Sequence, residues 1–230
     1  MIFRQLFDRK SSTYTYLLAE RAGGEALLID PVDENTDQYV RLLNALDVKL
    51  VLAVDTHIHA DHVTALGSLA AKTDCVTAMG EATGVECVSV RFNEGEKLRV
   101  DNLHLDILYT PGHTDDSYSF LLPDRVFTGD TLLIRGTGRT DFQNGDPAAQ
   151  YDSLFGKLLT LPSGTFVYPA HDYNGMTVST IEEELRHNPK LQVSSRQAYI
   201  DQMNALDLKD PELMDIAVPA NRCCGIRAAA

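Results

Sequence analysis

Residues 56–62 read Thr-His-Ile-His-Ala-Asp-His, directly after the apolar stretch formed by residues 51–55. Three imidazoles and one carboxylate therefore fall within six consecutive residues, from His57 to His62. Imidazole and carboxylate groups are ligands of divalent transition metals, and their clustering is typical of a metal site. A polar loop with no metal role gives no reason for such a concentration. The stretch predicts a metal-binding loop at the end of a strand.

Three further apolar stretches lead to a side chain of the same kind. Residues 106–110 precede His113, residues 126–128 precede Asp130, and residues 166–168 precede His171. Each strand would deliver a possible ligand just past its end, where a loop on a rigid sheet can hold it. Five of the seven histidines lie in these four loops, and we assign no role to His104 or His187.

Hydrophobic periodicity predicts strands in two groups, with helices between them. The expected strands are residues 2–7, 14–20, 25–30, 49–55, 75–79, 103–110, 117–122, 126–128 and 165–168. The expected helices are residues 39–46, 63–72, 147–161, 178–186, 194–206 and 211–216. This α/β pattern indicates two sheets packed together and covered by helices on both outer faces. Since no linker-like composition interrupts the chain, we expect one domain over residues 1–230, with the carboxy-terminal helices on the same core.

Composition excludes several classes of partner. The 230 residues include 33 acidic and 20 basic side chains, for a formal charge of −13, so the field repels nucleic acid and anionic lipid. No apolar run approaches the roughly 18 residues of a membrane span, and no apolar signal core precedes the first strand. Of the four cysteines, Cys223 and Cys224 are adjacent, a spacing that strains a disulfide. We therefore expect reduced thiols and a location in the cytoplasm or an equivalent organelle compartment.

The order of these motifs resembles the metallo-β-lactamase superfamily, which implies an αββα sandwich with a metal at one edge of the sheets. Narrower motifs resemble persulfide dioxygenases within it. These are Phe-Thr-Gly-Asp-Thr-Leu-Leu-Ile-Arg-Gly-Thr-Gly-Arg-Thr-Asp-Phe-Gln at 127–143, Tyr-Pro-Ala-His-Asp-Tyr at 168–173 and Ala-Val-Pro-Ala-Asn-Arg-Cys-Cys-Gly at 217–225.

The ligand count and the resemblance imply different metal centres. Seven candidates are enough for two zinc ions bridged by Asp130, and counting alone favours that arrangement: they are His57, His59, Asp61, His62, His113, Asp130 and His171. Resemblance to persulfide dioxygenases implies one Fe(II) per chain, held by His57, His113 and Asp130 with open positions for substrate and O2. His59, Asp61 and His62 would then support the ligands. We follow the narrower motifs and expect iron.

The activity implied by the resemblance is sulfide oxidation, in which glutathione persulfide and O2 give sulfite and glutathione. His171 and Tyr173 would act in catalysis, and the resemblance places Arg139, Arg222, Asn221 and Tyr173 at the substrate, with Arg135 behind them. We expect Asp141 to pair with an arginine, and Cys223 and Cys224 to have no catalytic role. The sequence allows a homodimer.

Two alternatives stay open. A hydroxyacylglutathione hydrolase would use two zinc ions to cleave a glutathione thioester. A non-catalytic metal-binding scaffold on the same fold is disfavoured, because an open ligand set containing carboxylates is unlike a closed structural zinc site.

Overall fold

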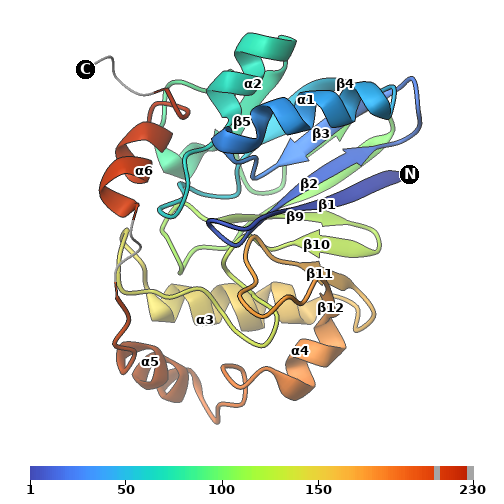
Figure 1. The fold of residues 1–230 in the computed structure, drawn as a ribbon. Helices are drawn as coiled ribbons and strands as arrows, with labels where there is room; N and C mark the ends of the chain where they lie inside the picture. The colour runs from blue at the N-terminus through green and yellow to red at the C-terminus, as the bar shows by residue number, and fades with distance from the viewer. Residues whose placement is uncertain (210–212, 227–230) are drawn as a thin grey trace. The chain divides into compact units, whose positions relative to one another are not determined.

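A six-stranded mixed sheet occupies the first part of the chain in this computed structural model, which describes residues 1–209 and 213–226 (Figure 1). Its order is β1-β2-β3-β4-β5-β6. The strands are β1 (Ile2–Asp8), β2 (Thr13–Ala19), β3 (Glu25–Ile29), β4 (Lys49–Val54), β5 (Val76–Gly80) and β6 (Val90–Phe92). The first three strands pair antiparallel and the next pairs are parallel. Parallel pairing needs crossovers, and helices supply them.

Helices α1 (Thr36–Ala45) and α2 (Leu66–Thr73) cross between these strands and pack against β4. The short 3-10 turns η1 (Asp33–Asn35) and η2 (Glu81–Thr83) and helix α6 (Met214–Asn221) complete this part. Leu28, Leu43 and Leu69 are among the side chains of its core. Apolar side chains at helical spacing on α1, such as Tyr39 and Leu43, thus cover one face of the sheet.

A second six-stranded mixed sheet has the order β12-β11-β10-β9-β8-β7. Its strands are β7 (Lys97–Val100), β8 (Leu103–Tyr109), β9 (Tyr118–Leu122), β10 (Arg125–Phe127), β11 (Phe166–Tyr168) and β12 (Ser179–Thr180). The accompanying helices are α3 (Pro147–Gly156), η3 (Leu158–Thr160), α4 (Ile181–His187) and α5 (Arg196–Asn204). Leu154, Val167 and Tyr199 belong to a second core that these elements bury.

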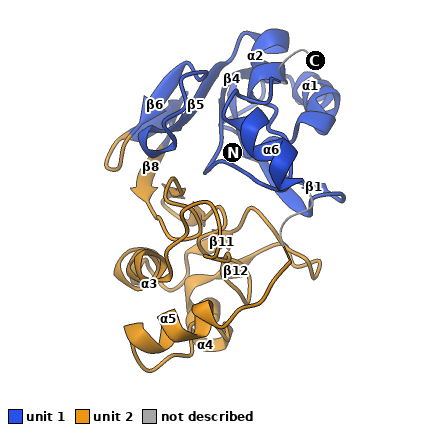
Figure 2. Ribbon diagram, turned by 90° about the vertical axis from the view of Figure 1, so that its left-hand side faces the viewer, with its two compact units in different colours: residues 1–92, 97–104, 210–230 blue, residues 93–96, 105–209 orange. Residues whose placement is uncertain are grey.

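The chain divides into two compact units, coloured separately in Figure 2. Unit 1 is residues 1–92, 97–104 and 210–230, and unit 2 is residues 93–96 and 105–209. Each unit has its own hydrophobic core. The expectation of one domain over the whole chain stays a prediction.

Most of the expected elements are present, with shifted ends. Strands β6 and β7 were missed because they are short and partly exposed. The helix expected over residues 147–161 begins as predicted, and Asp146 Oδ1 accepts from the Ala148 amide at 2.8 Å. It ends at Gly156, and the separate 3-10 turn η3 follows it. The stretch 178–186 splits into β12 and α4. Of the range 211–216, residues 211 and 212 lie outside the described residues, and α6 continues to Asn221.

The prediction of reduced cysteines is wrong. Cys87 and Cys224 form a disulfide across 137 residues of sequence, while Cys75 is buried and Cys223 exposed as free thiols. The spacing of the adjacent cysteines gives no signal for this bond, because folding brings the segment after η2 to the end of α6. The cysteines therefore give no support for a cytoplasmic location, which stays a prediction. Within the described residues, no helix has both the length and the apolar character needed to cross a membrane.

We expect the native protein to expose one reactive thiol, that of Cys223, and the unfolded, unreduced protein to expose a second from Cys75. Replacing Cys87 by Ser should lower the free energy of unfolding by about 4–5 kcal/mol in the chain-entropy account of a long closed loop. Cys223→Ser is the control and should change it little. Thiol titration and urea unfolding measure both effects, and four titratable thiols without reductant would contradict the expectation.

Candidate metal centre

The predicted metal-binding loop follows β4 and is here called the histidine loop, residues 55–64. His57, His59 and His62 are all buried, with at most 3% of any residue exposed. The ring centroids of His57 and His59 lie 4.1 Å apart, and those of His59 and His62 lie 4.3 Å apart. The loop thus gathers three imidazoles at the end of one buried strand.

Asp30, directly after β3, orders the histidine loop. Its carboxylate accepts from the Thr56 amide at 2.7 Å and from the Thr56 hydroxyl at 3.1 Å, and it lies 3.1 Å from His59 Nε2. Because an ionised carboxylate only accepts, His59 Nε2 carries the proton and Nδ1 keeps its lone pair. The Thr56 hydroxyl proton points to Asp30, so its oxygen accepts from His57 Nδ1 at 3.0 Å. Nε2 is left as the ligand atom of His57.

Asp55 is the other buried carboxyl beside Asp30. Burial raises the pKa of Asp55 well above its usual range, and the charge on Asp30 raises it further. Burial and the neighbouring carboxylate therefore both favour the neutral form of Asp55.

His62 is held by two neighbours. Its Nδ1 lies 3.0 Å from Asp61 Oδ2 and 3.3 Å from the Thr13 hydroxyl. Donation to the carboxylate fixes the proton on Nδ1, and Nε2 keeps its lone pair without a hydrogen-bond partner among the described residues.

In unit 2, Asp130 lies between two histidines. Its Oδ2 is 3.5 Å from His113 Nε2 and 3.7 Å from His171 Nε2. His113 Nδ1 donates to the Arg139 carbonyl at 2.7 Å, which leaves the lone pair of His113 Nε2 on the side of Asp130. Gly138 permits this approach, because a Cβ there would overlap the Asp130 carbonyl and crowd the His113 ring.

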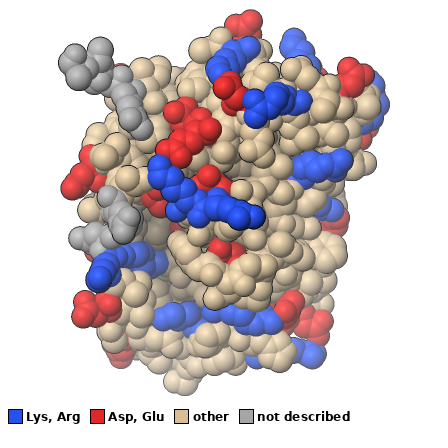
Figure 3. All heavy atoms as spheres, in the orientation of Figure 1, with Lys and Arg blue, Asp and Glu red and all other residues tan. Residues whose placement is uncertain are grey.

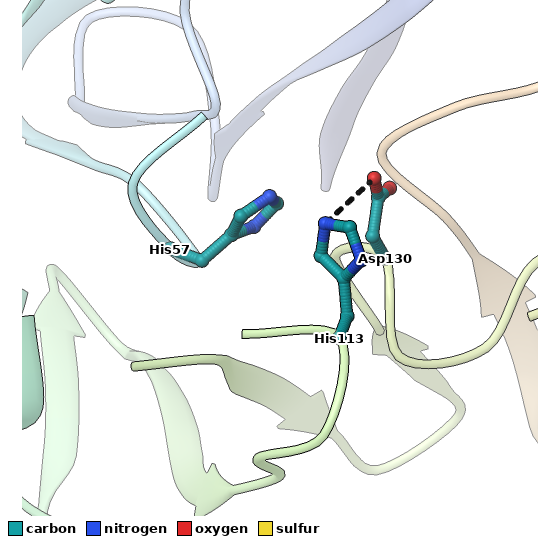
Figure 4. A group of neighbouring side chains, drawn as sticks. All are labelled: His57, His113 and Asp130. Atoms are coloured by element: carbon teal, nitrogen blue, oxygen red, sulfur yellow. Dashed lines mark ion pairs between the residues drawn. The ribbon is translucent and has the colours of Figure 1, made fainter. Parts of the chain in front are cut away.

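Two groups of candidate ligands have the expected donor chemistry. The first is His57 of unit 1 with His113 and Asp130 of unit 2, which Figure 4 draws with the ion pair between His113 and Asp130. The second is His59, Asp61 and His62 within unit 1, where one ligand atom of each lies within 4.8 Å of the others. Asp30, Asp55 and His59 form a further group within the same limit. The first two groups each offer two imidazoles and a carboxylate, a donor chemistry that suits a divalent transition metal.

Arg139 is occupied by contacts within the protein. Its Nε and Nη2 bind the Asp141 carboxylate at 2.5 and 2.6 Å, and Nη1 donates to the Lys209 carbonyl at 2.5 Å. The pairing expected for Asp141 is confirmed, and Arg139 lowers the pKa of that carboxyl. Arg135 is engaged in the same way, by Glu183 and the fully buried Glu184. These contacts indicate loop support, and a substrate contact of Arg139 stays a prediction.

The other predicted substrate residues differ in exposure. Asn221 is 1% exposed and its amide is bound to the histidine loop, which indicates an internal role, and a substrate contact of Asn221 stays a prediction. Arg222 is exposed and lines a pocket of about 580 Å³ with residues 84–87, Cys223 and Ile226. Tyr173 is 70% exposed and its ring is nearly parallel to that of His171, with the ring centroids 6.0 Å apart.

Acidic and basic side chains are interspersed on the face seen in Figure 3.

Sequence reasoning missed Asp30, Thr56 and Asp55 as parts of the site. Asp30 offered a weak signal, since it is an acidic residue directly after an apolar strand, like the ligands themselves. The positive φ of Asp30, 50°, has no signal in the sequence, because the backbone conformation of one residue depends on its surroundings.

Comparison with known families gives a match to the metallo-β-lactamase superfamily over residues 9–97 and 88–171. Persulfide dioxygenase ETHE1 of Mus musculus is 44% identical over 99% of this chain and 90% of that protein. A probable hydroxyacylglutathione hydrolase of Schizosaccharomyces pombe is 33% identical and aligns with 75% of this chain and 69% of that protein.

Among solved structures, ETHE1 from Myxococcus xanthus superposes with a TM-score of 0.96 at 53% identity, covering 98% of this chain and all of that one. This similarity confirms the predicted fold class of two mixed sheets with helices. It also covers the persulfide dioxygenase motifs at 127–143, which carried the narrower resemblance.

The Asp141–Arg139 ion pair predicts a pH-independent contribution to stability near neutrality. Because the pKa of Asp141 is lowered, its stabilisation is present above the unfolded value near 3.8 and is lost as pH falls through the lower folded value. Asp141→Asn should reduce the free energy of unfolding by about 1 kcal/mol, allowing for solvent screening, equally from pH 5 to 8.

The matched control is Asp152→Asn, which breaks the more exposed pair with Arg196 and should change stability less. Urea unfolding of the two variants at several pH values measures the difference. Equal losses, or a loss that varies between pH 5 and 8, would show that Asp141 is not supporting the loop as an ionised partner of Arg139.

Proposed function

Because this chain belongs to the persulfide dioxygenases of the metallo-β-lactamase superfamily, we propose that it oxidises glutathione persulfide to sulfite. The balanced reaction consumes one O2 and one water and gives glutathione and sulfurous acid. The observation that carries the proposal is 44% identity over 99% of this chain to persulfide dioxygenase ETHE1 of Mus musculus.

The donor set fits a single Fe(II) on His57, His113 and Asp130. Two imidazole nitrogens and one carboxylate oxygen make the ligand set of non-haem iron oxygenases, which leaves positions for substrate and O2. The proposal is supported within unit 2 by His113 Nε2, which lies 3.5 Å from Asp130 Oδ2, and within unit 1 by the hydrogen bond of His57 Nδ1 that leaves Nε2 as a ligand atom. When bound, Fe(II) would supply the redox chemistry that lets O2 react with the terminal sulfur.

The chain's own contribution is to present the ligand atoms in one orientation. Hydrogen bonds from Nδ1 of His57 to Thr56 and from Nδ1 of His113 to the Arg139 carbonyl fix both tautomers. Each ring then offers Nε2 without a proton rearrangement, and such supporting hydrogen bonds raise ligand basicity. His171, 1% exposed beside Asp130, excludes water from that carboxylate.

Tyr173 stands at the exposed side of His171, where its hydroxyl could donate to the persulfide sulfur or to oxygen. In a protein with a charge of −13, the two carboxylates of glutathione require a specific cation. Arg222 is the candidate that the contacts leave available, since Arg135 and Arg139 hold carboxylates of the protein. Arg139 would then act by supporting His113 through its carbonyl.

The second group, His59, Asp61 and His62, is the observation that favours the alternative. With zinc held by both groups, the chain would hydrolyse a glutathione thioester, the activity named for its more distant Schizosaccharomyces pombe relative. The higher identity to persulfide dioxygenases over nearly the whole chain favours iron at the first group alone. A homodimer and a cytoplasmic location remain part of the proposal.

The activity is tested with protein purified anaerobically, without added metal, and then loaded with Fe(II). Oxygen uptake should require both Fe(II) and glutathione persulfide, with sulfite and glutathione as products. Hydrolysis of lactoylglutathione should be negligible in the same preparation. Rapid thioester hydrolysis without persulfide-dependent oxygen uptake would replace this proposal with the hydrolase.

The single-iron centre predicts two classes of ligand variant. His57→Ala, His113→Ala and Asp130→Ala should each abolish iron retention, because two remaining protein ligands compete poorly with water. His62→Ala and Asp61→Ala should keep close to one iron per chain, with activity reduced on the order of 10–100-fold.

Metal analysis after anaerobic reconstitution measures this difference. Anaerobic loading matters because zinc binds nitrogen and oxygen sites more tightly than Fe(II), so zinc from aerobic preparations says little about the working metal. Two metals per chain in the parent protein, with His62→Ala and Asp61→Ala each losing one, would favour the dinuclear hydrolase.

A further inference from the structure

The end of α6 lies against the histidine loop within unit 1. Residues 221–225, here called the tail segment, begin with the last residue of that helix. The Asn221 side chain makes three hydrogen bonds of 2.8 Å: Oδ1 accepts from the Thr64 amide, and Nδ2 donates to the carbonyls of His59 and His62. Every hydrogen-bonding group of this buried amide is thus directed to one loop.

Two further contacts hold the tail segment in place. The Gly67 amide donates to the Cys224 carbonyl at 2.9 Å, and the disulfide joins Cys224 to Cys87. Gly225 has a φ of 79° and packs so closely that a Cβ would overlap the Thr64 carbonyl. The approach therefore requires glycine, both for its backbone conformation and for space.

The histidine loop has little regular structure to satisfy its own backbone. It has no helix or strand between β4 and α2, apart from the isolated bridge of Thr64 to Val32. Buried carbonyls without partners are costly, and a primary amide supplies two donors at fixed geometry. The planar side-chain amide of Asn221 thus joins three backbone groups of the loop. The directions of the histidine rings depend on that backbone.

We propose that Asn221 is a positioning residue for the metal centre, which acts by fixing the backbone of the histidine loop through the tail segment. It supplies no ligand and touches no substrate. The inference rests on the proposed metal site at His57. It is independent of the reaction, since the effect of Asn221 is measured as metal affinity. The tail segment, more than 150 residues from the loop in sequence, is by this inference part of the site.

The test measures Co(II) binding to the metal-free protein, using the visible spectrum of bound Co(II) as a probe of ligand geometry, and repeats the affinity with Fe(II) under anaerobic conditions. Asn221→Ala removes all three hydrogen bonds. Asn221→Asp keeps the volume and the acceptor for Thr64 but places an oxygen against two carbonyls. Both should weaken metal binding about 10–100-fold and change the Co(II) spectrum.

Gly225→Ala tests the same contact without altering Asn221. The matched control is Gly95→Ala, because Gly95 has a similar φ of 84° but nothing within 4 Å of an added Cβ. Gly225→Ala should weaken Co(II) binding at least about tenfold, the lower end of such losses, whereas Gly95→Ala should leave affinity and spectrum unchanged.

Loss of general stability is separated by Thr77→Val, which removes the buried hydroxyl's contacts to Ser89 in the same unit and none of the contacts of Asn221. It should lower resistance to urea but keep the Co(II) spectrum. If the folded Asn221 and Gly225 variants bind Co(II) with parent affinity and spectrum, the positioning role is refuted. If the parent protein itself binds no metal through His57, the proposed centre fails instead.

Discussion

The buried carboxylate of Asp30 is the contact on which the histidine loop depends. It stands at the end of β3 and accepts from both the amide and the hydroxyl of Thr56, so the strand end and the loop start are joined by one anion. Burying an ion is costly unless several donors surround it. Burial raises the pKa of the neighbouring Asp55 well above its usual range, and the charge on Asp30 raises it further. The loop is thus ordered around the carboxylate of Asp30.

The same logic orients the imidazoles. In four of the five candidate imidazoles, a neighbouring group holds one ring nitrogen. These groups are Thr56 for His57, Asp30 for His59, Asp61 for His62 and the Arg139 carbonyl for His113. The second nitrogen keeps its lone pair. Because tautomer and direction are fixed by the protein, the ligand atoms are selected before any metal binds, which lowers the cost of binding.

The sequence could predict the elements and the ligand candidates because both are local signals. Apolar strands ending in His or Asp are contiguous patterns, and β4 with its loop appears where expected. The disulfide between Cys87 and Cys224 and the amide contacts of Asn221 could not be predicted in this way, since they join segments more than 130 residues apart. Periodicity carries no information on which distant loops meet. The resemblance indicated that Asn221 matters but suggested a substrate contact for a residue that is 1% exposed.

The contacts of the arginines could not be predicted from the sequence either, for an electrostatic reason. An arginine in a motif can neutralise a carboxylate of the ligand or one of the protein, and sequence does not distinguish them. Arg139 and Arg135 hold acidic side chains of unit 2, so in this acidic protein they stabilise loops. Arg222 extends into an exposed pocket, while Asn221, its neighbour in the chain, is buried against the histidine loop. Two adjacent residues at the end of α6 therefore have different proposed roles. Substitution of Arg222 should change substrate affinity, and substitution of Asn221 should change metal affinity.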